Sequence, residues 1–137
     1  MPKTSLVYVD RSIPIEQMKG KAYDFAEDFI SYPEGMAENI NLKAYPFGFP
    51  ISSKNVVIFL ENQTEKPADV ADLVFWAERF KSEERVVVAL GKIFDFPNTA
   101  KPKRVVCLVK RSDGKRYLEF HDWNSTWPES CIFLARE

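Results

Sequence analysis

The chain has 137 residues, an apolar fraction of 45% and a formal net charge of −1 at pH 7. This length is typical of one domain, and the apolar fraction is that of a globular protein rather than a disordered one. The balanced charge excludes a whole-molecule field that would attract nucleic acid or an anionic membrane. We therefore expect one domain over residues 1–137, whose core needs no metal or disulfide to hold it together.

The sequence lacks the usual marks of export, membrane insertion and metal binding. No apolar run is long enough for a signal peptide at the amino terminus or for a membrane-spanning helix elsewhere. Cys107 and Cys131 lie in apolar, strand-like runs, where free cysteine behaves as a small hydrophobe. With a single histidine and no closely spaced ligand motif, we expect no metal, no cofactor, no membrane contact and a cytoplasmic location.

The amino-terminal part predicts a strand followed by a helix. Residues 6–9 are a short apolar run and are read as the first strand. Ser12 and Pro14 have the chemistry of a helix start, and Pro33 is expected to end that helix. Apolar residues spaced for one helical face lie between them: Ile15, Met18, Ala22, Phe25, Ala26 and Phe29.

Residues 33–55 hold three prolines and two glycines, and we expect a long loop with little regular structure. Tyr45 and Phe47 are two of its aromatic residues. Two interpretations are open: these aromatics plug one end of the core, or they face a ligand, as long loops often do.

A second strand is expected at residues 56–60, and a second helix opens between Thr64 and Pro67. Asp69 and Asp72 lie near the positive amino-terminal end of this helix. Its apolar stripe comprises Val70, Leu73, Val74, Ala77 and Phe80. Phe75 falls outside the stripe and needs a second contact, either the long loop or another subunit, so a homodimer is one expectation.

From residue 85 onward the pattern changes to strands. Residues 86–96 contain Gly91, which indicates a bulge or bend, and Asp113-Gly114 indicates a hairpin between residues 104–111 and 115–123. Residues 131–135 are the last strand. The expected fold class is α+β: two amphipathic helices on a curved, mostly antiparallel sheet of five or six strands, ending in a four-strand meander and roll-like.

A two-residue turn at Asp113 and Gly114 sets the register of this hairpin. It places Tyr117, Glu119, His121 and Trp123 in a row on one face, with Arg104 opposite Trp123. Cys107 then falls on the opposite, apolar face, with Val109, Leu118 and Phe120. On this register Cys107 and His121 point to opposite faces, which argues against a Cys–His nucleophilic pair, and a slip of one residue would reverse this argument.

Three functional hypotheses follow from these features. The leading one is a non-enzymatic binding module for a small apolar or aromatic ligand or for a protein partner. The residues expected to take part are Arg104, Tyr117, Glu119, His121, Trp123, Trp127, Tyr45 and Phe47. Trp123 and Trp127 lie in one dense connecting segment, which suits a binding hot spot or a cap on the core.

The alternative is a small hydrolase or isomerase, in which Glu119 and His121 act as an acid–base pair. The third hypothesis is nucleic-acid binding through the basic hairpin at residues 101–116, with Tyr117 and Trp123 as stacking platforms. Residues 97–118 carry seven basic residues against Asp113 alone, but residues 16–38 carry a net charge of −4. This acidic segment would repel a phosphate backbone, which argues against nucleic acid.

Overall fold

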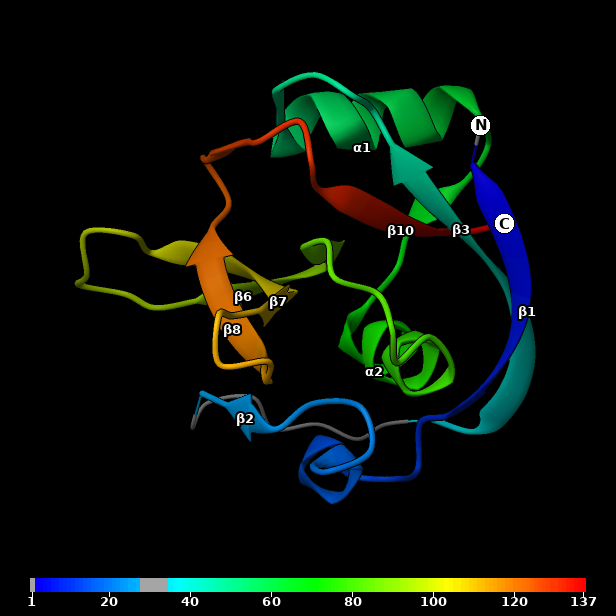
Figure 1. Cartoon of the computed structure of the whole chain (residues 1–137). Helices are drawn as coiled ribbons and strands as arrows, with labels where there is room; N and C mark the ends of the chain where they lie inside the picture. The colour runs from blue at the N-terminus through cyan, green and yellow to red at the C-terminus, as the bar shows by residue number, and fades with distance from the viewer. Residues whose placement is uncertain (1, 28–34) are drawn as a thin grey trace.

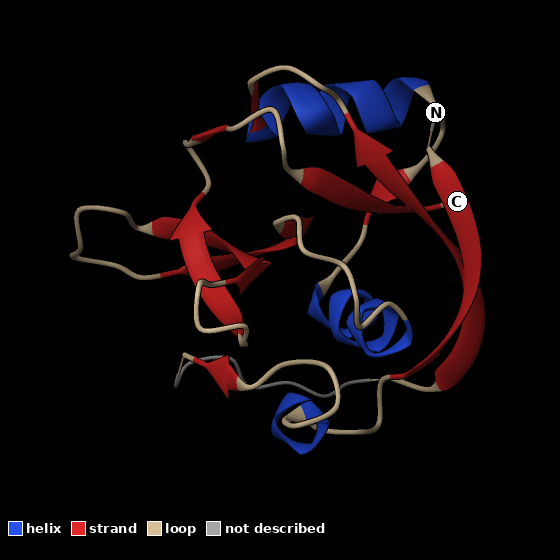
Figure 2. Ribbon diagram, in the orientation of Figure 1, coloured by secondary structure: helices blue, strands red, loops and turns tan. Residues whose placement is uncertain are grey.

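The computed structural model describes residues 2–27 and 35–137, which form a large mixed sheet and two α-helices (Figures 1 and 2). Eight strands make this sheet, in the order β1-β3-β10-β6-β7-β8-β2, with β5 also paired to β10. They are β1 (Lys3–Asp10), β2 (Phe25–Ala26), β3 (Ala37–Pro46), β5 (Lys66–Pro67), β6 (Val87–Asp95), β7 (Lys103–Lys110), β8 (Arg116–Asp122) and β10 (Ile132–Arg136). A second, two-stranded sheet joins β4 (Ile51–Ser52) to β9 (Thr126–Trp127).

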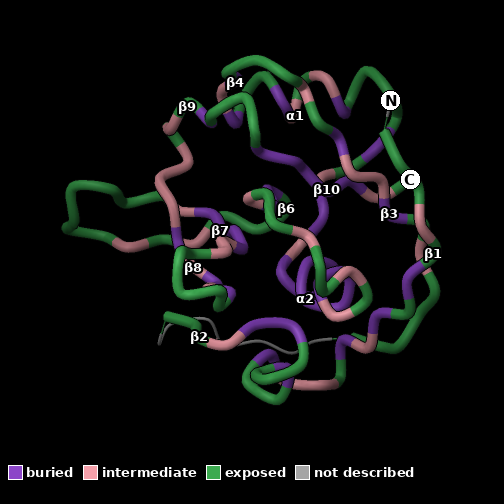
Figure 3. Tube along the Cα trace, in the orientation of Figure 1, coloured by how far each residue is buried: buried purple, intermediate pink, exposed green. Residues whose placement is uncertain are grey.

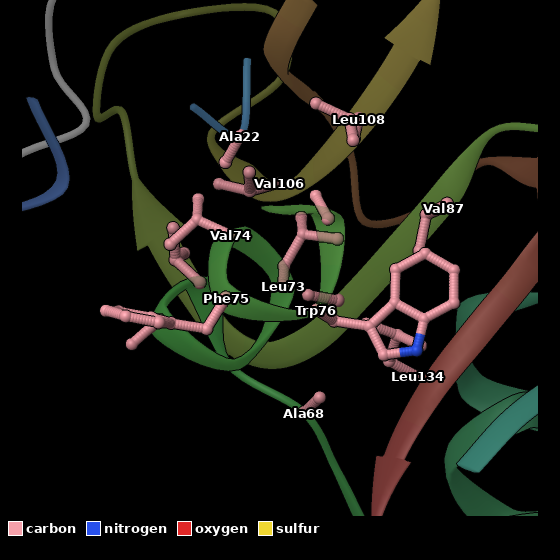
Figure 4. Packing of buried hydrophobic residues seen from close by; sticks show 14 of the residues in the cluster. Ala22, Ala68, Leu73, Val74, Phe75, Trp76, Val87, Val106, Leu108 and Leu134 are labelled. Atoms are coloured by element: carbon pink, nitrogen blue, oxygen red, sulfur yellow. The ribbon is translucent and has the colours of Figure 1, made fainter. Parts of the chain in front are cut away.

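The large sheet curves around α2 (Val70–Arg79), and α1 (Ser53–Asn62) lies on its other side (Figure 1). Each face carries its own hydrophobic cluster, because successive side chains of a strand point to opposite faces. Leu134 of β10 packs with α2 in the first cluster, whereas the preceding Phe133 packs with Val56 and Leu60 of α1 in the second. Figure 4 shows Leu73 and Val74 of α2 among sheet residues of the first cluster.

The second predicted helix is confirmed as α2, but it begins at Val70 rather than between Thr64 and Pro67, and its first residues explain why it starts there. The Asp69 side chain accepts a hydrogen bond from the Asp72 backbone N–H at 2.9 Å, and Asp72 accepts one from the Asp69 N–H at 3.1 Å. This reciprocal capping box satisfies two backbone donors that a helix start leaves unpaired. Most of α2 is buried, as Figure 3 shows.

The sequence pattern predicted that Phe75 points outward, and this prediction was wrong. Phe75 is only 9% exposed, and its ring meets Tyr8 of β1 edge-to-face at 6.5 Å between centroids. The second contact that Phe75 needs is therefore supplied by β1 of the same chain. Phe75 no longer gives a reason to expect a homodimer.

The prediction of a long first helix was wrong. Of the described residues in this segment, only Ile15–Met18 form a helix, of the 3-10 type, and Phe25 lies in β2 beside β8. Gly20 has a φ of +83°, which turns the chain out of the helical path. Ile15 and Met18 are buried as the apolar stripe predicted. The predictions made for Phe29 and Pro33 lie outside the described residues.

The predictions of a long loop at residues 33–55 and of a strand at residues 56–60 were also wrong. Residues Ala37–Pro46, inside the expected loop, form β3, which pairs with β1 on one side and β10 on the other. Residues 56–60, read as a strand, lie in α1, whose amino-terminal cap is the Ser52 hydroxyl accepting from Asn55 N–H at 3.2 Å. Val56 and Leu60 are the buried residues of that run, four apart, so a short apolar run did not separate helix from strand.

The β7–β8 hairpin exists, but its predicted register was off by one residue. The Gly114 N–H donates to the Arg111 carbonyl at 2.9 Å, and Gly114 has a φ of +81°, so the loop has three residues. Cys107 is therefore opposite Glu119, and Val105 is opposite His121. The face toward α2 instead comprises Val106, Leu108, Leu118 and Phe120.

The carboxyl-terminal strand does not complete a four-strand meander. β6, β7 and β8 form three antiparallel strands, and β10 lies between β3 and β6, parallel to β6. The bulge predicted at Gly91 is confirmed by the register shift in β6 between Ala89 and Phe94. The described chain is thus a mixed sheet, rich in antiparallel pairs, with two α-helices.

Candidate functional site

A cleft of about 370 Å³ opens beside β8 and the segment that follows it. Val109, Trp127 and Pro128 supply apolar walls, and Arg111, Glu119 and His121 supply polar groups. We call this the His121 cleft. Three of the residues that the sequence suggested for binding, Glu119, His121 and Trp127, meet here.

Glu119 is held from two sides in the His121 cleft. Its Oε2 accepts from Arg111 Nε at 3.0 Å and also from the second guanidinium nitrogen, while its Oε1 lies 3.1 Å from His121 Nε2. Arg111 follows β7, and Glu119 and His121 are two residues apart on one face of β8. The Glu119 hydrogen bond raises the pKa of Arg111, so this guanidinium stays charged. The His121 side chain is 41% exposed against 14% for Glu119, which leaves the imidazole the more accessible group.

Trp127 forms a fixed wall of the cleft. Its indole Nε1 donates to the buried Ser53 hydroxyl at 2.8 Å, and its backbone pairs with Ile51 in the small sheet. The His121 ring lies 5.7 Å from the Trp127 ring, tilted by 37°. Both the backbone and the ring of Trp127 are held, but the residue is only 3% exposed, so a ligand would meet a small, preorganised part of the ring.

The observed register places Cys107 on the same face as Glu119 and His121, so the geometric argument against a Cys–His pair was wrong. Burial, with a smaller contribution from Glu119, raises the pKa of the Cys107 thiol. Cys131 also lines the cleft, and burial raises its thiol pKa too. Both thiols therefore stay protonated at neutral pH, and a protonated thiol is a poor nucleophile.

The other predicted binding residues are spread over different parts of the molecule. Tyr45 is 7% exposed, and its hydroxyl donates to Glu65; burial raises the Tyr45 pKa to about 12. The Phe47 ring packs 5.2 Å from Phe59 and 5.6 Å from Phe133. Tyr45 and Phe47 thus belong to the cluster beneath α1, as the core-plug interpretation had it.

Arg104, Tyr117 and Trp123 do not reach the His121 cleft. Arg104 lies 4.2 Å over the Phe96 ring rather than against Trp123, because the register shift pairs it with Asp122. Tyr117 stacks on Phe25 at 5.0 Å. Trp123 lines a different cleft, on the side of Gly91 and Arg136.

Sequence reasoning missed Arg111 as a member of the site. Arg111 was counted only as one charge of the basic hairpin, although it is the residue that clamps Glu119. The available signal was the glycine at the third position of Ser112-Asp113-Gly114, which suits a three-residue loop as well as a two-residue turn. The longer loop would have placed Cys107 beside Glu119 and directed attention to this face.

Several charges of the basic segment are engaged within the chain. Arg116 is 7% exposed and donates to the Ala77 carbonyl at 3.0 Å, which fixes it against the end of α2. Lys103 pairs with Asp95 at 3.0 Å and Lys110 with Glu84 at 3.5 Å. The continuous cationic surface expected from the sequence is thereby interrupted.

Within residues 2–27 and 35–137, no group of three or more His, Cys, Asp or Glu side chains is arranged to hold a metal ion. No helix in these same ranges combines the length and apolar character that crossing a membrane requires. Comparisons with protein-family models, with curated proteins and with solved structures found no match. The function is therefore argued from the side chains of this chain alone.

Proposed function

We propose that this chain is a binding module that takes a small aromatic ligand into the His121 cleft. The observation that carries the proposal is the meeting of apolar walls, Val109 and Trp127, with the hydrogen-bonded set Arg111, Glu119 and His121 in one cleft of about 370 Å³. Small-molecule sites typically have volumes of roughly 300–1,000 Å³, apolar walls and a few convergent polar groups.

The imidazole suggests which polar group the ligand carries. An ionised carboxylate can only accept, so the Glu119 contact assigns the hydrogen to His121 Nε2. In the neutral ring, Nδ1 is then an acceptor. A phenol that lies in the cleft beside Trp127 could donate its hydroxyl hydrogen to Nδ1, so we propose a phenol-like ligand.

The test compares p-cresol with 4-methylanisole, which has the same ring but no hydroxyl hydrogen. Binding is followed by the NMR shift of the Trp127 indole N–H. We expect p-cresol to bind about threefold to tenfold more tightly, the value of one hydrogen bond. Val109→Phe should fill the cleft and abolish binding of both probes.

Ile93 lines the separate cleft that contains Trp123, so Ile93→Phe is the matched control and should leave both affinities unchanged. Far-UV circular dichroism establishes that both variants are folded. Equal affinities for p-cresol and 4-methylanisole would contradict a hydrogen bond from the ligand hydroxyl to His121 Nδ1. Binding that survives Val109→Phe in a folded protein would remove the cleft itself from the proposal.

A second candidate function is acid–base catalysis by Glu119 and His121, as in a small hydrolase or isomerase. Their separation of 3.1 Å favours it, because a carboxylate can orient an imidazole that transfers protons. Hydrolysis of p-nitrophenyl acetate by the purified protein, compared with His121→Asn, tests the hydrolase form. A rate equal in the two proteins would contradict a catalytic His121.

Other expectations stay proposals of lower rank. Nucleic-acid binding through residues 101–116 is weakened because Arg111 and Arg116 are engaged within the chain. A protein partner, a homodimer, a cytoplasmic location and a roll-like fold class stay predictions from the sequence.

A further inference from the structure

A second cleft, of about 540 Å³, lies where β6 separates from β10. β6 pairs with β10 only through Val87 and Val88, and β5 then takes the neighbouring position on β10. Gly91 closes the junction, with its N–H donating to the Ala68 carbonyl at 2.8 Å. We call this the Trp123 cleft, after the aromatic residue in its wall.

The walls of the Trp123 cleft are apolar and well fixed. Trp123 is half-buried against the second hydrophobic cluster, and its backbone N–H donates to the Lys103 carbonyl at 2.9 Å. The next N–H, of Asn124, donates to the Asp122 carboxylate at 3.0 Å. Leu90 and Ile93 of β6 supply the aliphatic part of the lining. The cleft therefore offers an indole carried on a hydrogen-bonded backbone, and an aliphatic surface, to a flat, apolar group.

Of the charged residues that line the cleft, Lys66 and Arg136 are basic and Asp69 is acidic. Asp69 is paired with Arg11 at 3.1 Å, and Arg136 is paired with Glu38 at 2.7 Å and lies 3.5 Å from Asp72. Lys66 also lines the cleft and is exposed, and among the described residues it makes no ion pair or side-chain hydrogen bond. Its ammonium is therefore available to an anion that enters the cleft.

We propose that the Trp123 cleft is a second ligand site, which binds an aromatic carboxylate. The aromatic ring lies against Trp123 and Ile93, and the carboxylate faces Lys66 with Arg136 beside it. An ammonium next to an apolar wall fits this ligand because one end needs charge and the other needs burial. The site is separate from the His121 cleft and does not rest on the function proposed for it.

The experiment uses three compounds that share the indole ring and differ in the charge of the side-chain end group: indole-3-acetate (−1), indole-3-acetamide (neutral) and tryptamine (+1). Dissociation constants are measured on the full chain by NMR titration at low salt. We expect the acetate to bind about fivefold more tightly than the neutral amide, the value of one exposed ion pair. Tryptamine should bind most weakly. Lys66→Met, which keeps the aliphatic stem, should make acetate and amide equal.

Two further variants separate this site from the other cleft. Ile93→Phe should block the Trp123 cleft and abolish binding of all three indoles. Val109→Phe should leave their affinities unchanged. Lys54→Met, an exposed lysine on α1, is the charge control and should keep the acetate preference.

The proposal is overturned if indole-3-acetate shows no preference over the amide, or if Lys66→Met leaves the preference intact. It is also overturned if Val109→Phe, rather than Ile93→Phe, abolishes indole binding, since the ligand would then occupy the His121 cleft. The function proposed for the His121 cleft is tested separately by p-cresol, so either proposal can fail without the other.

Discussion

At the scale of single residues, position 91 shows how closely two segments approach. A methyl group added to Gly91 would lie 2.6 Å from both the Pro67 and the Ala68 carbonyl oxygens. Both atoms belong to the backbone of the segment that pairs with β10, so relief would require that segment to move. The absence of a side chain here is therefore a packing requirement.

We predict that Gly91→Ala lowers the free energy of unfolding by about 1–3 kcal/mol, the usual cost of overpacking. Urea denaturation followed by circular dichroism measures it. The neighbouring Lys92→Ala, on an exposed side chain, is the control and should change stability little. A Gly91→Ala protein as stable as the parent would show that the 67–68 segment moves freely.

Asp72 is a fully buried carboxyl between two guanidinium groups. Arg11 contacts it at 2.6 Å and Arg136 at 3.5 Å. Burial, followed by the nearby charge of Asp69, raises the Asp72 pKa from 3.8 to about 6. The folded state therefore binds this proton more tightly than the unfolded state does. The contribution of the protonated Asp72 carboxyl to the free energy of unfolding is fully present below about pH 4 and is lost as the pH rises toward 6.

We predict that Asp72→Asn removes this pH dependence. The difference in unfolding free energy between parent and Asp72→Asn should shift against the parent as the pH rises from 4 to 6. Urea denaturation of both proteins across that range measures the difference, which cancels the contributions of other carboxyls. A pH-independent difference would mean that Asp72 titrates as it does in the unfolded chain.

At the scale of elements, α2 depends on its amino-terminal cap. Asp69→Ala removes the acceptor for the Asp72 N–H, whereas Asp69→Ser keeps an acceptor there and removes only the charge. We predict that the alanine variant is less stable than the serine variant by about 0.5–2 kcal/mol. Thermal or urea unfolding of the pair measures this. Equal stabilities would show that the hydrogen bond from the Asp72 N–H to the residue 69 side chain does not stabilise the helix.

In the elements that the sequence predicted correctly, two independent sequence features indicate the same structure. α2 has both the apolar stripe and the acids at its start, and β6 with its bulge at Gly91 has both an apolar run and a glycine. The predicted first helix satisfied the periodicity, but Gly20 lay inside it. In β3, alternate residues such as Leu42 and Ala44 turn inward, and the surrounding prolines and glycines masked this period of two.

The candidate site was only partly predictable for a related reason. Glu119 and His121 are two apart on one strand, so their proximity follows from strand geometry alone. The clamp from Arg111 depends on loop length in the hairpin. The Trp127 wall depends on Ser53, 74 residues away in the chain. A contact of that kind is decided by tertiary packing, which local patterns do not contain.

At the scale of the whole molecule, the two hydrophobic clusters share the strands of one sheet. We predict that they unfold together, as one cooperative domain. Trp76 lies in the first cluster and Trp127 in the second, so each can report on its own cluster. Two variants are compared, each of which keeps one of these tryptophans and has the other tryptophans changed to Phe. Within each variant, the urea midpoint reported by the remaining tryptophan should equal the midpoint that circular dichroism gives for that same variant. Two midpoints within one variant would mean independent units.

The central position of β10 has a consequence for how the protein is made. During synthesis the ribosome delivers β1, β3, β6, β7 and β8 before β10, yet β10 lies between β3 and β6. Until residues 132–136 emerge, β3 and β6 each expose an unpaired edge, and such edges recruit other chains. Before β10 is available, any sheet that the nascent chain forms has unpaired edges at β3 and β6. Aggregation during expression should therefore depend on how quickly translation reaches β10.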